Sequence, residues 1–235
     1  PAAAAGRMES IVDALDPAAE LVEPDPATEA QIAAVHSREH IEWVKEAGVY
    51  EAAALAAGGA IKTAEIALSE PCFGLIRPPG HHASTDSAWG FCYFNNMAVA
   101  LTHLKARKAI DTAYVLDIDL HYGDGTEDTL GGKEWARVYN VSAKGRSAYL
   151  LSVRDEMEYC NADVIGVSAG FDAHQDDWGG ILTTDDYRQI GRMVKVSADR
   201  CGGSCFALLE GGYNHRVLGQ NVAALMEGLA GSNAF

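Results

Sequence analysis

The chain has 235 residues, 48% of them hydrophobic, which suits one large domain or two small ones with a substantial core. Its formal net charge of −15 argues against nucleic acid as a partner and is compatible with a cationic substrate. No apolar run reaches transmembrane length, no signal-peptide pattern stands at the N-terminus, and the five scattered cysteines form no disulfide framework. We therefore expect a cytoplasmic protein with reduced thiols and no membrane partner.

Helical patterns and short apolar runs alternate along the chain. The small residues of 51–68 predict a closely packed helix, and the apolar run 72–77 predicts a strand that ends at Pro78. The same pattern predicts, in chain order, a helix over 94–109, strands over 113–119 and 137–142, a helix over 147–160, a strand over 162–170, a helix over 185–201, a strand over 205–213 and a helix over 221–230. Short buried strands that alternate with helices are typical of an α/β fold whose parallel sheet is covered on both faces.

Polar residues gather where four of the predicted strands end. In a parallel sheet of this kind the ligand site lies beyond the carboxyl ends of the strands. We therefore expect these side chains to lie along one edge of the sheet. In chain order they are His81 and His82, Asp119 and His121, Asp172, and Tyr213.

Three of these residues have the chemistry of a metal site. Asp119 and His121 are two positions apart, so they share one face of a strand, and Asp172 adds a second carboxylate. Oxygen and nitrogen donors without thiolate suit Zn²⁺ or Fe²⁺, and three protein ligands leave a position open for water. The alternative is that Asp119 caps a turn and His121 is a core histidine.

The remaining polar residues suit acid–base chemistry. His81 and His82 follow a stiff Pro-Pro-Gly entry and can act as general base and general acid. Asp117 and Asp124 can orient these imidazoles, although Asp124 also fits an ordinary turn. Tyr213 follows two glycines and can donate to an oxyanion. A metal, a base and an oxyanion donor together indicate a hydrolase of amides or esters.

Five motifs in this chain resemble the zinc-dependent histone deacetylase superfamily, which includes bacterial histone-deacetylase-like amidohydrolases and acetylpolyamine amidohydrolases. They occur in the family's order, and GRMESI near Arg7 resembles its early helix. The motifs are RPPGHHA (77–83), WGFCYFNN (89–96), LDIDLHYGDGT (116–126), SAGFDAH (168–174) and LEGGYN (209–214).

The resemblance implies an arginase-like, three-layer α/β fold with a mostly parallel sheet of about eight strands. It implies one catalytic domain over 1–235 that removes acetyl or related acyl groups from acetyl-lysine or acetylpolyamines, with His82 as the main acid–base residue. It also implies a structural K⁺ and a substrate tunnel. The implied residues are Asp119, His121 and Asp172 for zinc; Asp117 and Ser142 for K⁺; Asp117 and Asp124 beside the histidines; His81, His82 and Tyr213 for catalysis; and Gly90, Phe91, Gly211 and Gly212 along the tunnel.

The chain departs from the family pattern in three places. Tyr122 replaces a second histidine, QDDWGG (175–180) replaces Asp-Pro-Leu so that Trp178 takes the place of a rim leucine, and rim loops near 42–53 and 141–146 are short. We expect that an N-terminal segment and some surface loops are missing from the sequence, the alternative being a compact variant with an open site.

Two other functions stay open, an arginase-like ureohydrolase with two manganese ions and an inactive protein that binds acetylated ligands. A homo-oligomer is compatible with the family.

Overall fold

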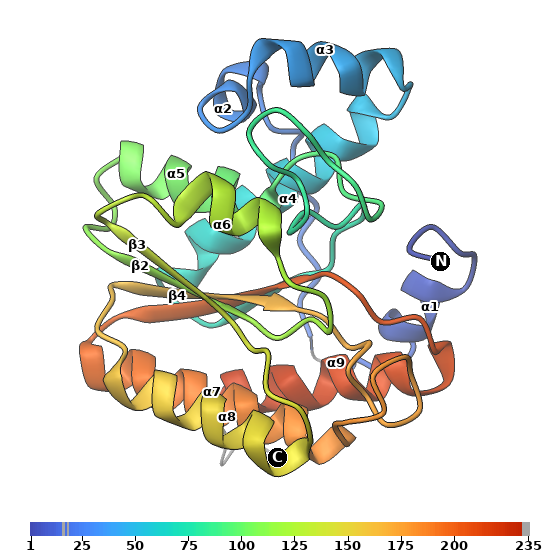
Figure 1. Cartoon of the computed structure of the whole chain (residues 1–235), viewed down its shortest axis with the longest axis vertical. Coiled ribbons are helices and arrows are strands. Elements are labelled where there is room, and N and C mark those ends of the chain that lie inside the picture. The colour runs from blue at the N-terminus through green and yellow to red at the C-terminus, as the bar shows by residue number, and fades with distance from the viewer. Residues whose placement is uncertain (16, 18, 232–235) are drawn as a thin grey trace.

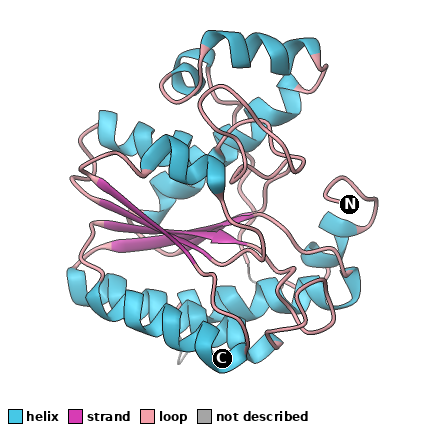
Figure 2. Cartoon of the chain, in the orientation of Figure 1, coloured by secondary structure: helices cyan, strands magenta, loops and turns pink. Residues whose placement is uncertain are grey.

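A single parallel sheet forms the centre of the molecule. The computed structural model describes residues 1–15, 17 and 19–231. Its strands pair in the order β1-β5-β4-β2-β3, and every pairing is parallel. Figure 2 shows these strands as one layer between two layers of helices. The strands are β1 (Cys72–Gly74), β2 (Ala113–Asp117), β3 (Ala136–Asn140), β4 (Val164–Ala169) and β5 (Ser204–Leu209).

Helices cover both faces of this sheet. Helices α4, α5 and α6 lie on one face and α7, α8 and α9 on the other, while α2 and α3 sit above α4 and α1 lies beside α9 (Figure 1). The helices are α1 (Arg7–Val12), α2 (Glu29–Ala33), α3 (Arg38–Glu46), α4 (Tyr50–Ala67), α5 (Asn96–Ala106), α6 (Asp124–Leu130), α7 (Arg146–Tyr159), α8 (Thr184–Cys201) and α9 (His215–Leu229). The predicted three-layer α/β class is therefore confirmed.

The expected number of strands was wrong, because the sheet has five strands and not about eight. The five apolar runs of the sequence correspond to the five strands, and the larger number came from the family resemblance alone. Strand β1 is three residues long and pairs only with β5 among the described strands, so it forms one edge of the sheet.

Capping residues set the helix ends more sharply than apolar periodicity does. Thr183 and Asp186 form a capping box at the start of α8. Helix α9 begins at His215, earlier than the predicted 221, because the Asn214 side chain accepts from the backbone of Arg216. Around 42–53, where a rim loop was expected to be short, residues 47–49 alone connect α3 to α4.

The hydrophobic core lies on both faces of the sheet, and the polar candidate residues lie at the edge where the strands end. Strands β2 and β4 are buried along their whole length, with apolar clusters against α7–α9 and against α4–α5. Since all strands are parallel, the segments that follow β1, β2, β4 and β5 emerge at one edge. Within the described part of the chain, no helix is long and apolar enough to cross a membrane.

Candidate active site

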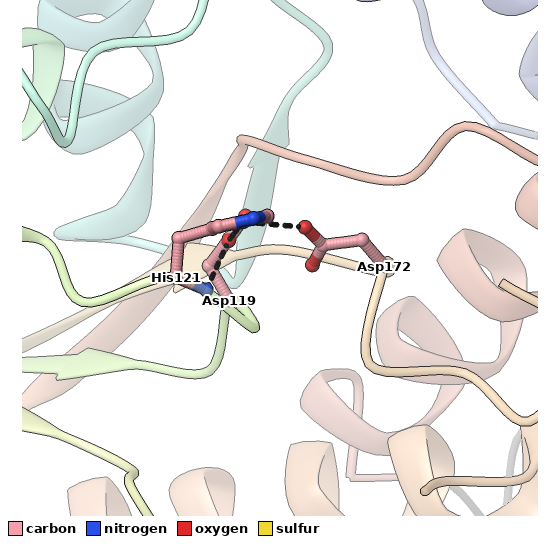
Figure 3. Close-up of side chains that lie close together, drawn as sticks. All are labelled: Asp119, His121 and Asp172. Atoms are coloured by element: carbon pink, nitrogen blue, oxygen red, sulfur yellow. Dashed lines mark hydrogen bonds and ion pairs between the residues drawn. The ribbon is translucent and has the colours of Figure 1, made fainter. Parts of the chain in front are cut away.

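Three side chains from two strand ends converge on one point. His121 Nδ1 lies 3.1 Å from Asp119 Oδ1 and 2.9 Å from Asp172 Oδ2 (Figure 3). Asp119 and His121 follow β2, and Asp172 follows β4, which is the neighbouring strand. Both carboxylates are buried, whereas the imidazole is 37% exposed and faces the pocket described below. The predicted metal ligands are thus brought together.

This cluster fits a divalent metal ion. The ligand atoms of all three residues lie within 4.8 Å of one another. Asp172 Oδ2 is buried and makes no well-directed hydrogen bond, although it lies at ion-pair distance from His121. Burial beside Asp119 raises the pKa of Asp172 to about 6, and the two carboxylates raise the pKa of His121 to about 10. The site thus attracts positive charge, and its two oxygens and one nitrogen are a donor set that suits zinc.

Backbone groups hold the Asp119 carboxylate in place. Its Oδ2 accepts from the Gly211 N–H at 2.8 Å, and its Oδ1 accepts from the His121 N–H at 2.9 Å. A Cβ at Gly211 would lie 2.6 Å from Asp119 Oδ2 and 2.9 Å from Asp172 Oδ2. Only glycine therefore lets the chain after β5 approach both carboxylates this closely.

The two histidines after β1 each face one carboxylate. His81 Nδ1 lies 3.0 Å from Asp117 Oδ2, and His82 Nδ1 lies 2.7 Å from Asp124 Oδ1. Burial would lower the pKa of His81, but Asp119 and Asp117 raise it well above its usual value. Burial and the neighbouring His81 lower the pKa of His82, against the effect of Asp124. The two imidazoles therefore differ in proton affinity, as a base and its charged neighbour would.

Tyr213 lies on the loop that connects β5 to α9. Its N–H and that of Asn214 both donate to Asp177 Oδ2, at 2.7 and 2.8 Å. Burial near Asp119 and Asp172 raises the pKa of the Tyr213 phenol above its usual value. The phenol therefore stays protonated at neutral pH and can donate a hydrogen bond.

A pocket of about 160 Å³ connects these groups. Three of the four predicted tunnel residues, Gly90, Phe91 and Gly211, line it, whereas Gly212 is not among the lining residues. The full lining is Pro79, His81, His82, Trp89, Gly90, Phe91, His121, Trp178, Gly211 and Tyr213.

The two residues predicted for potassium lie in different surroundings. Asp117 is buried, and its Oδ1 accepts from the Asp119 N–H at 3.0 Å while its Oδ2 faces His81. Ser142 follows β3 and is exposed. The structure thus places Asp117 beside His81 and Ser142 at the surface.

Sequence reasoning missed two buried charged residues behind the site. Glu210 Oε2 accepts from the N–H groups of Gly80 and His81, at 2.8 and 3.2 Å. The Arg7 guanidinium donates to the carbonyl oxygens of Gly212 and Glu210, at 2.9 and 2.6 Å. Both side chains thus brace the loops that carry the catalytic candidates. Glu210 directly follows a buried strand in LEGGYN, which was a usable signal, whereas the resemblance of GRMESI marked the helix at Arg7 but gave its side chain no role.

Known proteins that are similar to this chain are named as deacetylases or amidohydrolases. The chain is similar to a probable deacetylase of Methanothermobacter thermautotrophicus, with 31% identity over 96% of this chain and 85% of that protein. It is 29% identical to a histone deacetylase-like amidohydrolase of Pseudomonas aeruginosa, over 96% of this chain and 75% of that protein. It is 30% identical to an acetylpolyamine amidohydrolase of Mycoplana ramosa, over 78% of this chain and 64% of that protein.

A solved structure and a family model agree with these relatives. The crystal structure of the HDA15 HD domain superposes with a TM-score of 0.81 at 25% identity, covering 96% of this chain and 82% of that one. The model of the histone deacetylase domain matches residues 2–149 and 143–229. The two matched segments meet where the sequence suggested a shortened loop. Because the match spans nearly the whole chain, the protein belongs to the histone deacetylase domain family.

Proposed function

We propose that this protein is a metal-dependent amidohydrolase that removes acetyl or a related acyl group from an acylated amine. The observation that carries the proposal is the convergence of Asp119, His121 and Asp172 beside His82 and Tyr213 at one pocket. Relatives named as deacetylases and amidohydrolases support the reaction class. Acetyl-lysine and acetylpolyamines are the two substrate classes that fit.

Asp119, His121 and Asp172 would hold the metal, which we propose to be zinc. A zinc ion in such a site supplies Lewis acidity, lowering the pKa of a water molecule to about 7 and polarising a carbonyl oxygen. Asp172 Oδ2 is a buried ligand oxygen that accepts no well-directed hydrogen bond from the protein. A structural K⁺ near Asp117 stays a prediction, and the exposure of Ser142 favours other oxygen donors for it.

His82 would act as the base and then as the acid. Asp124 fixes the Nδ1 proton of His82, so Nε2 is the nitrogen that can take a proton from the attacking water. After the water oxygen bonds to the acyl carbon, the same proton can pass to the amine nitrogen as the C–N bond breaks. His81, held by Asp117 and by Glu210 through its backbone, would supply a positive charge beside the developing oxyanion.

Tyr213 would stabilise the tetrahedral intermediate. Its protonated phenol can donate to the oxyanion, which forms only when the acyl carbon becomes tetrahedral. Asp177 anchors the backbone of Tyr213, so the phenol enters the pocket from a fixed loop.

The two rival functions have weaker support. A ureohydrolase with two manganese ions needs further bridging carboxylates, and the described residues contain one three-residue group suited to a metal. A binding protein that has lost activity would not need His82, Asp124 and Tyr213 all in place, yet all three are present around the pocket.

A paired assay tests the proposal. The zinc-loaded protein is incubated with an acetyl-lysine peptide and with acetylputrescine, and the amine released is measured with and without a hydroxamate inhibitor. We expect hydroxamate-sensitive release from at least one of the two substrates. Release of urea from arginine instead, or binding of acetylated ligands without turnover, would contradict the proposal.

A further inference from the structure

Trp89 makes two contacts with the His82–Asp124 pair. Its indole N–H donates to Asp124 Oδ2 at 2.8 Å, while Asp124 Oδ1 faces His82 Nδ1 at 2.7 Å. The indole ring also stacks on the imidazole of His82, with ring centroids 3.8 Å apart and an interplanar angle of 29°. The three side chains therefore form a closed set in which each touches the other two.

The backbone after Trp89 fixes the indole in this place. Gly90 has a φ of +62°, and a Cβ there would lie 2.5 Å from His82 Cδ2. Phe91 also adopts a left-handed φ, of +67°, and the Cys92 N–H donates back to the Trp89 carbonyl at 3.0 Å. This tight turn passes directly over the imidazole, so the indole has little freedom to leave it.

Asp124 needs a second partner because its side chain is 46% exposed, whereas that of His82 is 4% exposed. An exposed carboxylate can rotate and exchange its hydrogen bonds with water. Occupying Oδ2 with the indole N–H leaves Oδ1 directed at His82. The stacked ring also covers one face of the imidazole.

We propose that Trp89 is a positioning residue for His82, which it orients through Asp124. This inference rests on the proposed function, in which His82 moves the proton. Nothing in the described contacts of Trp89 gives it a role in holding the metal ligands, so its effect should appear in the proton-transfer step.

A double-mutant cycle tests the coupling. Trp89→Phe keeps an aromatic face on His82 but removes the N–H donor, and Asp124→Ala removes its acceptor. We expect Trp89→Phe to lower kcat about tenfold and to change KM less than about twofold, with unchanged zinc content. In the Asp124→Ala background, the same Trp89→Phe change should alter kcat less than about twofold, because the carboxylate through which the indole acts on His82 is already absent.

Trp43→Phe is the matched control. Trp43 is 45% exposed, comparable with Trp89 at 55%, and stacks on His40 instead of a residue of the pocket. We expect this variant to keep kcat. Equal losses from Trp89→Phe in both backgrounds would overturn the inference, because the indole would then act independently of Asp124.

A second readout does not depend on turnover. In ¹H–¹⁵N spectra of histidine-labelled protein, the Nδ1 proton of His82 is assigned as the downfield signal that His82→Gln removes. We expect Trp89→Phe to make this proton exchange faster with water, while Trp43→Phe leaves it unchanged. An unchanged exchange rate in Trp89→Phe would overturn the inference. If Trp89→Phe exchanges this proton faster but the parent itself shows no deacetylase activity, the positioning role is supported and only the proposed function is contradicted.

Discussion

The phenol of Tyr213 stacks on the indole of Trp178, with ring centroids 4.1 Å apart and an interplanar angle of 28°. Trp178 also meets His121 edge-on, at a centroid distance of 5.9 Å. One exposed indole thus touches both the proposed oxyanion donor and a proposed metal ligand. It stands where the family pattern has a rim leucine, so the sequence marked the position but not the stacking.

Trp178→Leu should change both rate and acyl preference. The stack on Tyr213 contributes about 0.5–1.5 kcal/mol of interaction energy that holds the phenol in its orientation. Without it, kcat for an acetyl substrate should fall about 2- to 10-fold. Removing the indole also enlarges the pocket, so the ratio of butyryl to acetyl turnover should rise. Steady-state kinetics on matched acetyl and butyryl peptides measure both effects. An unchanged ratio would show that Trp178 does not limit the acyl group.

Tyr213→Phe should lower turnover about 100- to 1,000-fold, because it removes one oxyanion donor and little else. Zinc content should stay at the parent's level, since Tyr213 is not one of the three clustered ligands. The comparison uses kcat together with metal analysis of the purified variant. Tyr159→Phe is the control, because Tyr159 is 78% exposed on α7, and it should retain full activity. Parent-like turnover in Tyr213→Phe would remove the residue from the mechanism.

Residues at the strand ends were predicted to lie close together, and the structure brings Asp119, His121 and Asp172 together. Asp119 and His121 directly follow the buried strand β2, which marks them as residues of the sheet edge. The strand was expected to reach 119 but ends at Asp117, and the His121 N–H, which donates to Asp119 Oδ1, holds the two residues together. Asp172 joins them because β4 is the neighbour of β2 in a parallel sheet, although the order of strands was not readable from the chain. The five strands were likewise visible as apolar runs.

Contacts between distant loops could not be predicted in this way. Trp89 and Asp124 are 35 positions apart, and Arg7 and Glu210 are 203 apart, with no periodicity that links either pair. The sequence left Asp124 open between orienting an imidazole and an ordinary turn, and the structure makes it the first residue of α6, facing His82. Glycines on both sides of Asp124 conceal that helix start, since they weaken its local propensity.

Asp172→Ala should abolish stable zinc binding. The variant loses one of three ligands, so zinc affinity should fall more than about 100-fold, beyond the loss typical of residues that only orient a ligand. Since a metal that binds only the folded state raises the Tm, zinc should stabilise the parent and leave the variant's Tm unchanged. Calorimetric titration and thermal unfolding with and without a chelator measure both quantities.

Asp176→Ala is the matched control for this experiment, because Asp176 lies in the same loop and is exposed. It should bind zinc as the parent does. Stoichiometric, tightly bound zinc in Asp172→Ala would show that the clustered residues do not form the metal site.

His36 should make the stability of the protein depend on pH. Its Nδ1 faces the Ser84 carbonyl at 2.9 Å, and its Nε2 accepts from the Asn95 N–H at 2.9 Å, so the ring must be neutral with its proton on Nδ1. Burial, together with the neighbouring His40, lowers the pKa of His36 to about 4. Since Ser84 and Asn95 flank the loop that carries Trp89, protonation of His36 would loosen one wall of the pocket.

The sign of this effect follows from the direction of the pKa shift. Between pH 6.5 and about 4 the unfolded chain binds the His36 proton and the folded chain does not, so the free energy of unfolding falls as pH decreases through this window. The full decrease in the free energy of unfolding is about 3 kcal/mol. His36→Gln can supply the same donor and acceptor without titrating, so urea unfolding between pH 7 and about 4 should show a shallower decline than in the parent. Parallel pH dependences in the two proteins would mean that His36 is not kept neutral by the fold.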